Sequence, residues 1–569
     1  MSVACSRSHT SLFSLLLYPA LSIFFTLAAP AHAVTYYVDA MNGSDDNPGT
    51  AEELAWQSLQ QVEDASPAFQ PGDIIRFKCG QIFKGRIRYY GPSGTPDAPV
   101  TFTSYGVGAR PVLTAIDVIP AQWTDLGNNK WSTAIDKPTS RLWKDGVEQK
   151  KATPVELGHT WDEFGQVAGI TWAYDSNTLY FYSETDPSSA VFTGNRQWNV
   201  LYIRDKAYIH ITGLDLRGAI NQDISLPGCD HIAIDHCNIG MYSAGAIDLG
   251  DTDNILIERN TVDSGFRLRF EGVESYSGTD NRGVNDAISS FQASRDNEIR
   301  YNDFRDWSHA DVELELKDDS ELTGYRIHHN LFTAPDLSYG RAIAISGTNV
   351  HGIEINNNYF YDLITPNQLN GRDNHIHHNW FDTIKDTKLK DGEQGQAITL
   401  SPYNGRVNNN LIEYNTFTDG EGPCVELISY GDEEGDDVSG NTLQNNLFIN
   451  CGTAPWYPAG LGKGIYIQPY LGMGPNNFYN NIFSSPFTEN TVFHRDAEVT
   501  PGGFNDRDGQ DGDSISGNGT LAELAGQGAG TLDITTIGVN GTEPLPAIPP
   551  EPVSGHDQGR FCPGIYLLL

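Results

Sequence analysis

The chain has 569 residues, of which 39% are hydrophobic, and its formal net charge is −37 at neutral pH. This charge excludes nucleic acid as a partner, because a phosphate backbone is bound through clustered Lys and Arg that displace its counterions. It also repels polyanions in general, unless a bound cation or a local basic group intervenes.

The first 33 residues have the pattern of an export signal. Arg7 precedes an apolar run from Leu12 to Leu27, and Ala31-His32-Ala33 closes the segment. A short apolar run followed by a small-residue motif is typical of a cleaved signal, whereas a membrane anchor needs a longer span. We therefore expect cleavage after Ala33 and a secreted or periplasmic protein that is free of the membrane.

Six cysteines remain once Cys5 is removed with the signal, and no two of them have the C-x-x-C spacing of a metal site. They are Cys79, Cys229, Cys237, Cys424, Cys451 and Cys562. An exported protein can form disulfides, but a buried cysteine can equally serve as a small hydrophobe. The sequence leaves their pairing open.

Two segments precede the main repeat of the chain. Residues 34–120 open with an alternating run and a turn-rich stretch, and we expect them to form an N-terminal cap with the first coils, which protects strand edges from aggregation. Residues 121–195 contain alternating aromatic runs such as 179–182. We expect them to form a small inserted β-domain.

From residue 254 to 483, within an expected β-helix over 196–490, one phrase recurs: an Asn, a variable residue, then an apolar residue, usually Phe. Eight copies, 21 to 42 residues apart, begin at Asn260, Asn302, Asn330, Asn358, Asn379, Asn415, Asn446 and Asn481. Each follows a short polar and β-branched run, often with the period-two pattern of a half-buried strand. The irregular spacing favours coils of short strands joined by loops of varying length. We expect each Asn to adopt left-handed backbone angles and to bond the Asn of the next coil.

In these repeats the chain resembles the secreted, carbohydrate-active proteins of the pectin lyase-like family. The resemblance implies an all-β, single-stranded right-handed parallel β-helix of about ten coils, with inward Ile and Phe stacked between coils. It implies a loop-rich closing segment over 491–569. We expect a monomer that acts on a polysaccharide and needs no organic cofactor.

In this family the reactive groove usually runs along one stacked sheet. Alternation in the expected strands leaves seven side chains on its outer face: Asp248, Ser289, Glu313, Glu315, Thr399, Glu426 and Tyr466. Asp248, Glu426 and Tyr466 are candidates for substrate binding. The loop residues Tyr339 and Tyr403 join them, because aromatic rings can stack on sugar rings.

The segment 309–319 is the strongest candidate for a reactive site. Alternation places Asp311, Glu313, Glu315 and Lys317 on one face of a strand, with neighbours about 6.6 Å apart. Like charges this close are unfavourable unless a cation, a proton or Lys317 relieves them, although a merely solvated acidic face is the alternative. With His309 at the start of the segment and Arg341 one coil later, the candidate catalytic residues are His309, Glu313, Glu315, Lys317 and Arg341.

One chemistry for this segment is β-elimination on a uronate polysaccharide. Ca²⁺ held by Asp286, Asp311, Glu313 and Glu315 would neutralise the uronate carboxylate. Lys317 or Arg341 would then remove the acidified C5 proton. A β-helix lyase family that degrades alginate and chondroitin uses a similar Glu-x-Glu calcium pair. There the Lys follows after four intervening residues, whereas here it follows after one.

The other chemistry is inverting hydrolysis, in which one carboxyl group protonates the leaving oxygen and another, about 6.5–9.5 Å away, activates water. Certain β-helix galactan hydrolases use a Glu-x-Asp pair that Glu313-x-Glu315 resembles. The acidic surface favours hydrolysis and the basic Lys317 and Arg341 favour elimination, and we place the lyase first by a small margin. A non-catalytic carbohydrate-binding or surface protein is the third possibility.

Overall fold

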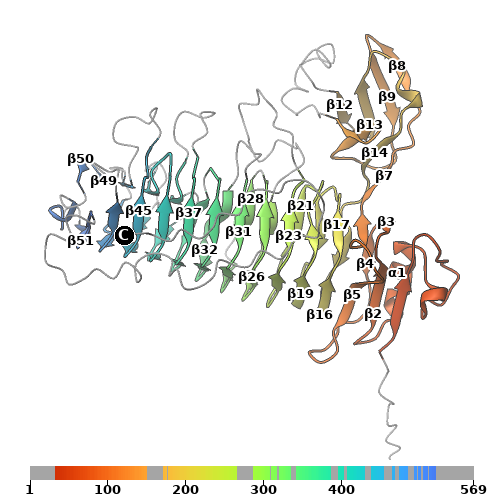
Figure 1. The fold of residues 1–569 in the computed structure, drawn as a ribbon, viewed down its shortest axis with the longest axis horizontal. Coiled ribbons are helices and arrows are strands. Elements are labelled where there is room, and N and C mark those ends of the chain that lie inside the picture. Colours follow the sequence, from red (N-terminus) through yellow and green to blue (C-terminus); the bar gives the residue numbers. More distant parts are fainter. Residues whose placement is uncertain are drawn as a thin grey trace, which may run out of the picture. The chain divides into compact units, whose positions relative to one another are not determined.

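The computed structural model describes residues 33–149, 171–175, 177–265, 286–307, 309–316, 320–334, 341–364, 366–385, 395–402, 406–429, 437–453, 464–467, 473–484, 492–495, 497–500, 504–509 and 512–520. Three long sheets, almost wholly of parallel strands, dominate this part of the chain (Figure 1). The expected signal before Ala33, the closing segment beyond Thr520, and the candidates Lys317, Tyr339 and Tyr403 lie outside the described residues.

The first sheet has 14 strands, each paired in parallel with the strand of the next coil. Its members are β1 (Thr35–Val38), β2 (Ile74–Lys78), β5 (Val100–Tyr105), β16 (Ala207–Thr212), β19 (Asp230–Asp235), β22 (Leu256–Glu258), β26 (Glu298–Arg300), β30 (Arg326–His328), β33 (Glu354–Asn356), β36 (His375–His377), β40 (Leu411–Glu413), β44 (Thr442–Gln444), β47 (Asn477–Tyr479) and β51 (Ser514–Ser516).

The second sheet has 13 strands and follows the first after a short turn in each coil. Its members are β3 (Ile82–Lys84), β6 (Val112–Thr114), β17 (Asp215–Arg217), β20 (Asn238–Ile239), β23 (Thr261–Asp263), β27 (Asp303–Arg305), β31 (Leu331–Thr333), β34 (Tyr359–Tyr361), β37 (Trp380–Asp382), β41 (Thr416–Thr418), β45 (Leu447–Ile449), β48 (Ile482–Ser484) and β52 (Gly519–Thr520).

The third sheet has 17 strands and carries the candidate site. Its members are β4 (Ile87–Tyr89), β15 (Leu201–Ile203), β18 (Gln222–Ser225), β21 (Gly245–Asp248), β24 (Asp286–Ser290), β25 (Ser294–Arg295), β28 (Ala310–Glu315), β29 (Leu322–Thr323), β32 (Arg341–His351), β35 (Asn367–Arg372), β38 (Ile398–Leu400), β39 (Arg406–Asn408), β42 (Val425–Leu427), β43 (Asp437–Ser439), β46 (Ile465–Ile467), β49 (Val492–His494) and β50 (Ala497–Val499).

Each coil adds a strand to each sheet, as β26, β27 and β28 do in turn, so the fold is the predicted parallel β-helix. Ten strands of the first sheet, from β16 to β47, lie between residues 200 and 490, in agreement with the expected number of coils. Inward Ile, Leu, Val and Phe of all three sheets form one continuous core. Phe332, Phe360 and Phe381 are fully buried there, with successive ring centroids 5.0 and 4.6 Å apart.

The repeated Asn residues form the predicted ladder. The Nδ2 of Asn358, for example, donates to Asn379 Oδ1 at 3.1 Å and to the carbonyl of Ile327 at 2.8 Å. The predicted left-handed backbone was assigned to the wrong residue, however. The positive φ angles belong to the residue before each Asn, such as Asn357 at 52° and His378 at 55°. The chain turns its corner at that residue, and the following Asn lies buried between coils, where its amide bonds those of its neighbours.

Antiparallel strands occupy the segment between β6 and β15. One sheet joins β7 (Ile116–Val118), β14 (Phe192–Asn195), β10 (Leu142–Lys144) and β11 (Val147–Glu148). A second joins β8 (Thr124–Gly127), β9 (Lys130–Ala134), β13 (Thr178–Tyr182) and β12 (Trp172–Asp175). They share a small hydrophobic core of their own, which includes Trp172 and Phe192. The 3₁₀ helix η3 (Pro187–Ser189) also lies in this segment.

The remaining helical elements lie near the N-terminus: η1 (Glu52–Leu54), α1 (Leu59–Ala65) and η2 (Ser66–Ala68). Ser58 caps α1 by accepting a hydrogen bond from the backbone N–H of Gln61, as N-cap serines commonly do. Leu59 and Val62 of α1 are buried in the main core. Within the described residues, none of the helices has the length and apolar character that crossing a membrane requires.

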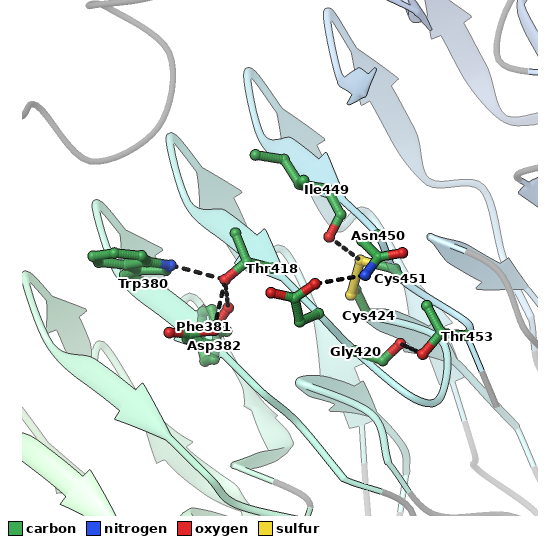
Figure 2. The surroundings of a disulfide bond; sticks show 11 residues. Trp380, Phe381, Asp382, Thr418, Gly420, Cys424, Ile449, Asn450, Cys451 and Thr453 are labelled. Carbon is green, nitrogen blue, oxygen red and sulfur yellow. Dashed lines mark hydrogen bonds between the residues drawn. A yellow bond between two sulfur atoms is a disulfide. The ribbon is translucent and has the colours of Figure 1, made fainter. Parts of the chain in front are cut away.

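One disulfide joins neighbouring coils. Figure 2 shows Cys424, just before β42, bonded to Cys451, just after β45. Beside it, the Thr453 hydroxyl donates to the carbonyl of Gly420 at 3.2 Å. Cys79, Cys229 and Cys237 are free thiols, and the latter two are buried. The sequence left open which cysteines pair. The folded chain brings Cys424 and Cys451 of neighbouring coils together.

Candidate active site

A row of aligned side chains crosses the outer face of the third sheet. The register places these residues side by side on successive strands: Ser225, Asp248, Ser289, Glu313, Ala344, Gln368, Thr399, Glu426 and Tyr466. Strands of a sheet lie about 4.8 Å apart, so Asp248 is about 10 Å from Glu313 along this row and Glu426 is about 19 Å away. Of the predicted substrate-binding residues, Asp248 is therefore the nearest to the acidic segment.

The centre of the row is a cluster of Asp286, His309 and Glu313. His309 Nδ1 donates a hydrogen bond to Asp286 Oδ1 at 2.7 Å and lies 2.5 Å from Glu313 Oε2. Asp286 begins β24, Glu313 lies in β28, and His309 directly precedes β28. One imidazole nitrogen thus approaches two carboxyl groups, which neighbouring coils supply.

Burial and neighbouring charges shift the pKa values of Asp286 and His309. Burial and the nearby Glu313 charge raise the pKa of Asp286 to about 7, although the His309 hydrogen bond opposes the shift. Burial alone would lower the pKa of His309, but the two carboxyl partners outweigh it and raise that pKa to about 10. His309 is therefore an imidazolium cation at neutral pH.

The pKa of Glu313 moves the other way. Burial raises it, but the hydrogen bonds and charge of His309, together with Asp286 and the Arg341 cation, outweigh burial and leave the pKa below its ordinary value. Asp311, two residues earlier on the same strand, is fully buried. Burial first, and then the charges of Asp306, Asp303 and Asp286, hold the pKa of Asp311 well above its ordinary value. The pKa values of two carboxyl groups on one strand are therefore shifted in opposite directions, downward for Glu313 and upward for Asp311.

The closest contacts of Glu313 differ from those that the sequence suggested. We predicted Glu313 and Glu315 as the working pair, yet the groups against Glu313 are His309 and Asp286. Glu315 lies further along β28, beside Ser346 of β32, and is partly exposed. Arg341 begins β32 beside Ala310, within electrostatic reach of Glu313.

The cluster also has the composition of a metal site. One ligand atom from each of Asp286, His309 and Glu313 lies within 4.8 Å of the others. Two carboxylates suit Ca²⁺, which prefers oxygen ligands, but the third group is an imidazole nitrogen, which suits transition metals better. The His309 cation already offsets the carboxylate charge here, so the donor set fits Ca²⁺ less well than four oxygen ligands would.

Three further residues contribute to the site, of which sequence reasoning missed two, Asp303 and Asp306. Ser289, in the same row between Asp248 and Glu313, is 1% exposed and its Oγ has no hydrogen-bond partner. Asp303 and Asp306 act on the pKa of Asp311 although they precede its strand. Alternation within a strand had placed Ser289 on the outer face, whereas only the fold brings Asp303 and Asp306 close to Asp311.

Comparisons with known proteins found similarities in sequence and in structure. Over 128 residues the chain is 31% identical to lacto-N-biosidase of Bifidobacterium longum, a match that covers 21% of this chain and 8% of that protein. The structure of XylC with xylose matches with a TM-score of 0.50 at 14% identity, covering 81% of this chain and 86% of that one. The structure of GH136 lacto-N-biosidase from Eubacterium ramulus matches with a TM-score of 0.40 at 14% identity, covering 86% and 67% of the two chains. No model of a known protein family matches the chain.

Proposed function

We propose that the chain is an exported carbohydrate-active enzyme that hydrolyses glycosidic bonds of a glycan, with Glu313 as the general base and Asp311 as the general acid. The observation that carries the proposal is the opposite shift of two pKa values on one strand face. A buried, protonated carboxyl group beside an ionised one is the arrangement by which one site supplies both an acid and a base at neutral pH.

The spacing of the two groups suits an inverting mechanism. Residues two apart on a strand lie about 6.6 Å apart, at the lower end of the range of about 6.5–9.5 Å that leaves room for a water molecule. Asp311 would protonate the leaving oxygen, and Glu313 would take a proton from the attacking water. His309 keeps Glu313 ionised and orients its carboxylate, so we assign His309 and Asp286 a positioning role.

Other observations support this proposal. The lacto-N-biosidase that matches 128 residues of this chain is named for a glycosidase activity, and the match spans 8% of that protein. The Cys424–Cys451 disulfide is typical of an oxidising compartment and so supports export.

A calcium-assisted lyase is the second candidate. It is favoured by the Arg341 cation near Glu313 and by the carboxylates of Asp286 and Glu313, which could bind Ca²⁺. In that case Ca²⁺ would neutralise a substrate carboxylate, and this chain's basic side chains would take up the C5 proton.

The deciding experiment measures new reducing ends and unsaturated products from a panel of neutral and uronate polysaccharides. Hydrolysis predicts reducing ends without unsaturated sugars, and EDTA should leave the rate unchanged. Glu313→Gln and Asp311→Asn should each lower kcat by about a hundredfold or more, the scale of losing a general base or acid. Unsaturated products, or variants that keep wild-type rates while folding normally, would refute the proposal.

A further inference from the structure

Strand β32 presents only small side chains beside the proposed base. Inward Ile343 and Ile345 alternate with Ala344 and Ser346, which continue the rows of Glu313 and Glu315 on the outer face. Ala344 lies next to Glu313 in the register and Ser346 lies next to Glu315. We call Ala344 and Ser346 the β32 floor, because neither side chain extends more than one atom beyond its Cβ.

Amide and hydroxyl groups border the β32 floor on the side away from the carboxyl groups. Gln368 lies next to Ala344, and Asn370 lies next to Ser346. On the following strand Thr399 lies next to Gln368. The backbone N–H of Ser401 donates to the carbonyl of Leu369, which continues that register and places Ser401 beside Asn370. The floor is thus flanked by acids from β28 and by neutral polar groups from β35 and β38.

Two of these polar groups are buried without partners. Asn370 has no exposed surface, and neither its Oδ1 nor its Nδ2 has a hydrogen-bond partner. Ser401 is 1% exposed, and its Oγ also has none. Buried polar groups in folded proteins are nearly always paired, because an unpaired one has lost its bonds to water without replacement. Asn358 of the ladder shows the usual situation, since its amide is fully bonded.

A further unpaired group, the amide of Asn367, does not belong to this surface. It lies in the inward row between Ile343 and Ile398, and nothing in the structure explains it. Asn370 and Ser401 differ from it because they face the same side of the sheet as Glu313. Their missing partners are therefore groups that a ligand on that face can supply.

We propose that Asn370, Ser401 and Gln368 form a subsite that binds one neutral sugar unit of the substrate over Ala344, adjacent to the bond on which Glu313 acts. An amide offers a donor and an acceptor and a hydroxyl offers both, which matches the hydroxyl or acetamido groups of a sugar. None of the three side chains is charged, so they do not compensate a uronate carboxylate. This inference rests on the proposed function, because it identifies the substrate class of the same site.

The test measures binding, so that it does not depend on turnover. In the Glu313→Gln background, titration calorimetry compares neutral xylo-oligosaccharides and N-acetylhexosamine-containing oligosaccharides with an oligogalacturonate. The neutral probes should bind more tightly. Asn370→Ala and Ser401→Ala should each weaken binding of the best neutral probe about two- to tenfold, the effect of losing a neutral hydrogen bond. Asn477→Ala is the matched control, because Asn477 lies on the first sheet and donates to Thr442 Oγ1 at 3.1 Å.

A second variant occupies the subsite instead of removing its polar groups. Ala344→Leu should abolish binding of the neutral probe, because the larger side chain fills the space over the floor. Thermal unfolding separates binding from folding: Asn370→Ala should keep the parent Tm or raise it, since it removes an unpaired buried amide, whereas a merely structural role would lower it.

The possible outcomes distinguish a failure of the proposed subsite from a failure of the proposed hydrolysis. Preference for the oligogalacturonate, unchanged affinity in Asn370→Ala and Ser401→Ala, or the absence of binding by any probe would overturn the subsite. If the neutral probe binds as expected but wild-type protein releases no reducing ends from it, hydrolysis fails while the subsite stands.

Discussion

At the scale of single residues, the site is governed by the position of one imidazole. His309 carries a positive charge because two buried carboxyl groups surround it, and its charge in turn keeps Glu313 ionised. The two shifts reinforce each other, because His309 is the strongest of the groups that lower the pKa of Glu313, and Glu313, after Asp286, raises the pKa of His309. At Asp311, burial and then the charges of Asp306, Asp303 and Asp286 raise the pKa well above its ordinary value.

His309→Gln should therefore change the pH dependence of the reaction. Without the imidazolium, burial dominates at Glu313 and its pKa rises, so a higher pH is needed to ionise the base. The acid limb of kcat/KM should move upward by about one pH unit or more, since one unit corresponds to about 1.4 kcal/mol of lost charge interaction.

The measurement is a kcat/KM profile on the best glycan substrate. His375→Gln is the control, because His375 also pairs with a carboxylate, Glu413 at 2.9 Å, but lies on the first sheet. An acid limb that stays in place in His309→Gln would show that His309 does not set the ionisation of the base.

At the scale of elements, the coil is held by side chains that repeat from one turn to the next. The Asn ladder satisfies the backbone at each corner, and the Phe column fills the space behind it. Both act between coils, so a change in one coil is felt by its two neighbours, as in other repeat proteins.

Asn358→Ala should destabilise the protein markedly. The backbone N–H of Asn330 donates to Asn358 Oδ1 at 3.0 Å, and the Asn358 amide donates to two further acceptors. Removing it leaves several buried groups unpaired, at a cost of about 1–3 kcal/mol each. The midpoint of urea unfolding should fall markedly in Asn358→Ala. It should fall little in the control Asn477→Ala, because Asn477 is partly exposed. Equal midpoints for the two variants would contradict the structural role of the ladder.

The disulfide should contribute to stability through the loop that it closes. Cys424 and Cys451 are 27 residues apart, for which loop entropy predicts about 3–4 kcal/mol. The double variant Cys424→Ser/Cys451→Ser should unfold at lower urea concentration by that amount. Dithiothreitol should reproduce the effect in wild-type protein and add nothing in the variant; a wild-type protein indifferent to reductant would argue against the bond.

At the scale of the whole molecule, the mature protein should be exported and begin at Val34. The basis is the apolar run that ends in Ala31-His32-Ala33. Expression in a bacterial host followed by N-terminal sequencing of the periplasmic or medium fraction checks this. Ala33→Phe should retain an uncleaved precursor, because the site requires small residues. A wild-type protein that keeps Met1 would refute the expectation.

The sequence by itself determined the β-helix, the ladder of Asn residues and the strand that carries the acidic side chains. These features follow from short-range patterns: a two-residue alternation decides which side chains face inward, and a repeated phrase marks each corner. Tertiary structure alone decided which carboxyl groups meet. Asp286 is 23 residues from His309 and 27 from Glu313, and coil spacings vary with loop length, so no local pattern could place Asp286 against His309. It likewise decided the Cys424–Cys451 pairing, the opposite pKa shifts of Asp311 and Glu313, and the partnerless position of Asn370, because burial and electrostatics depend on neighbours that only the stacking of coils brings together.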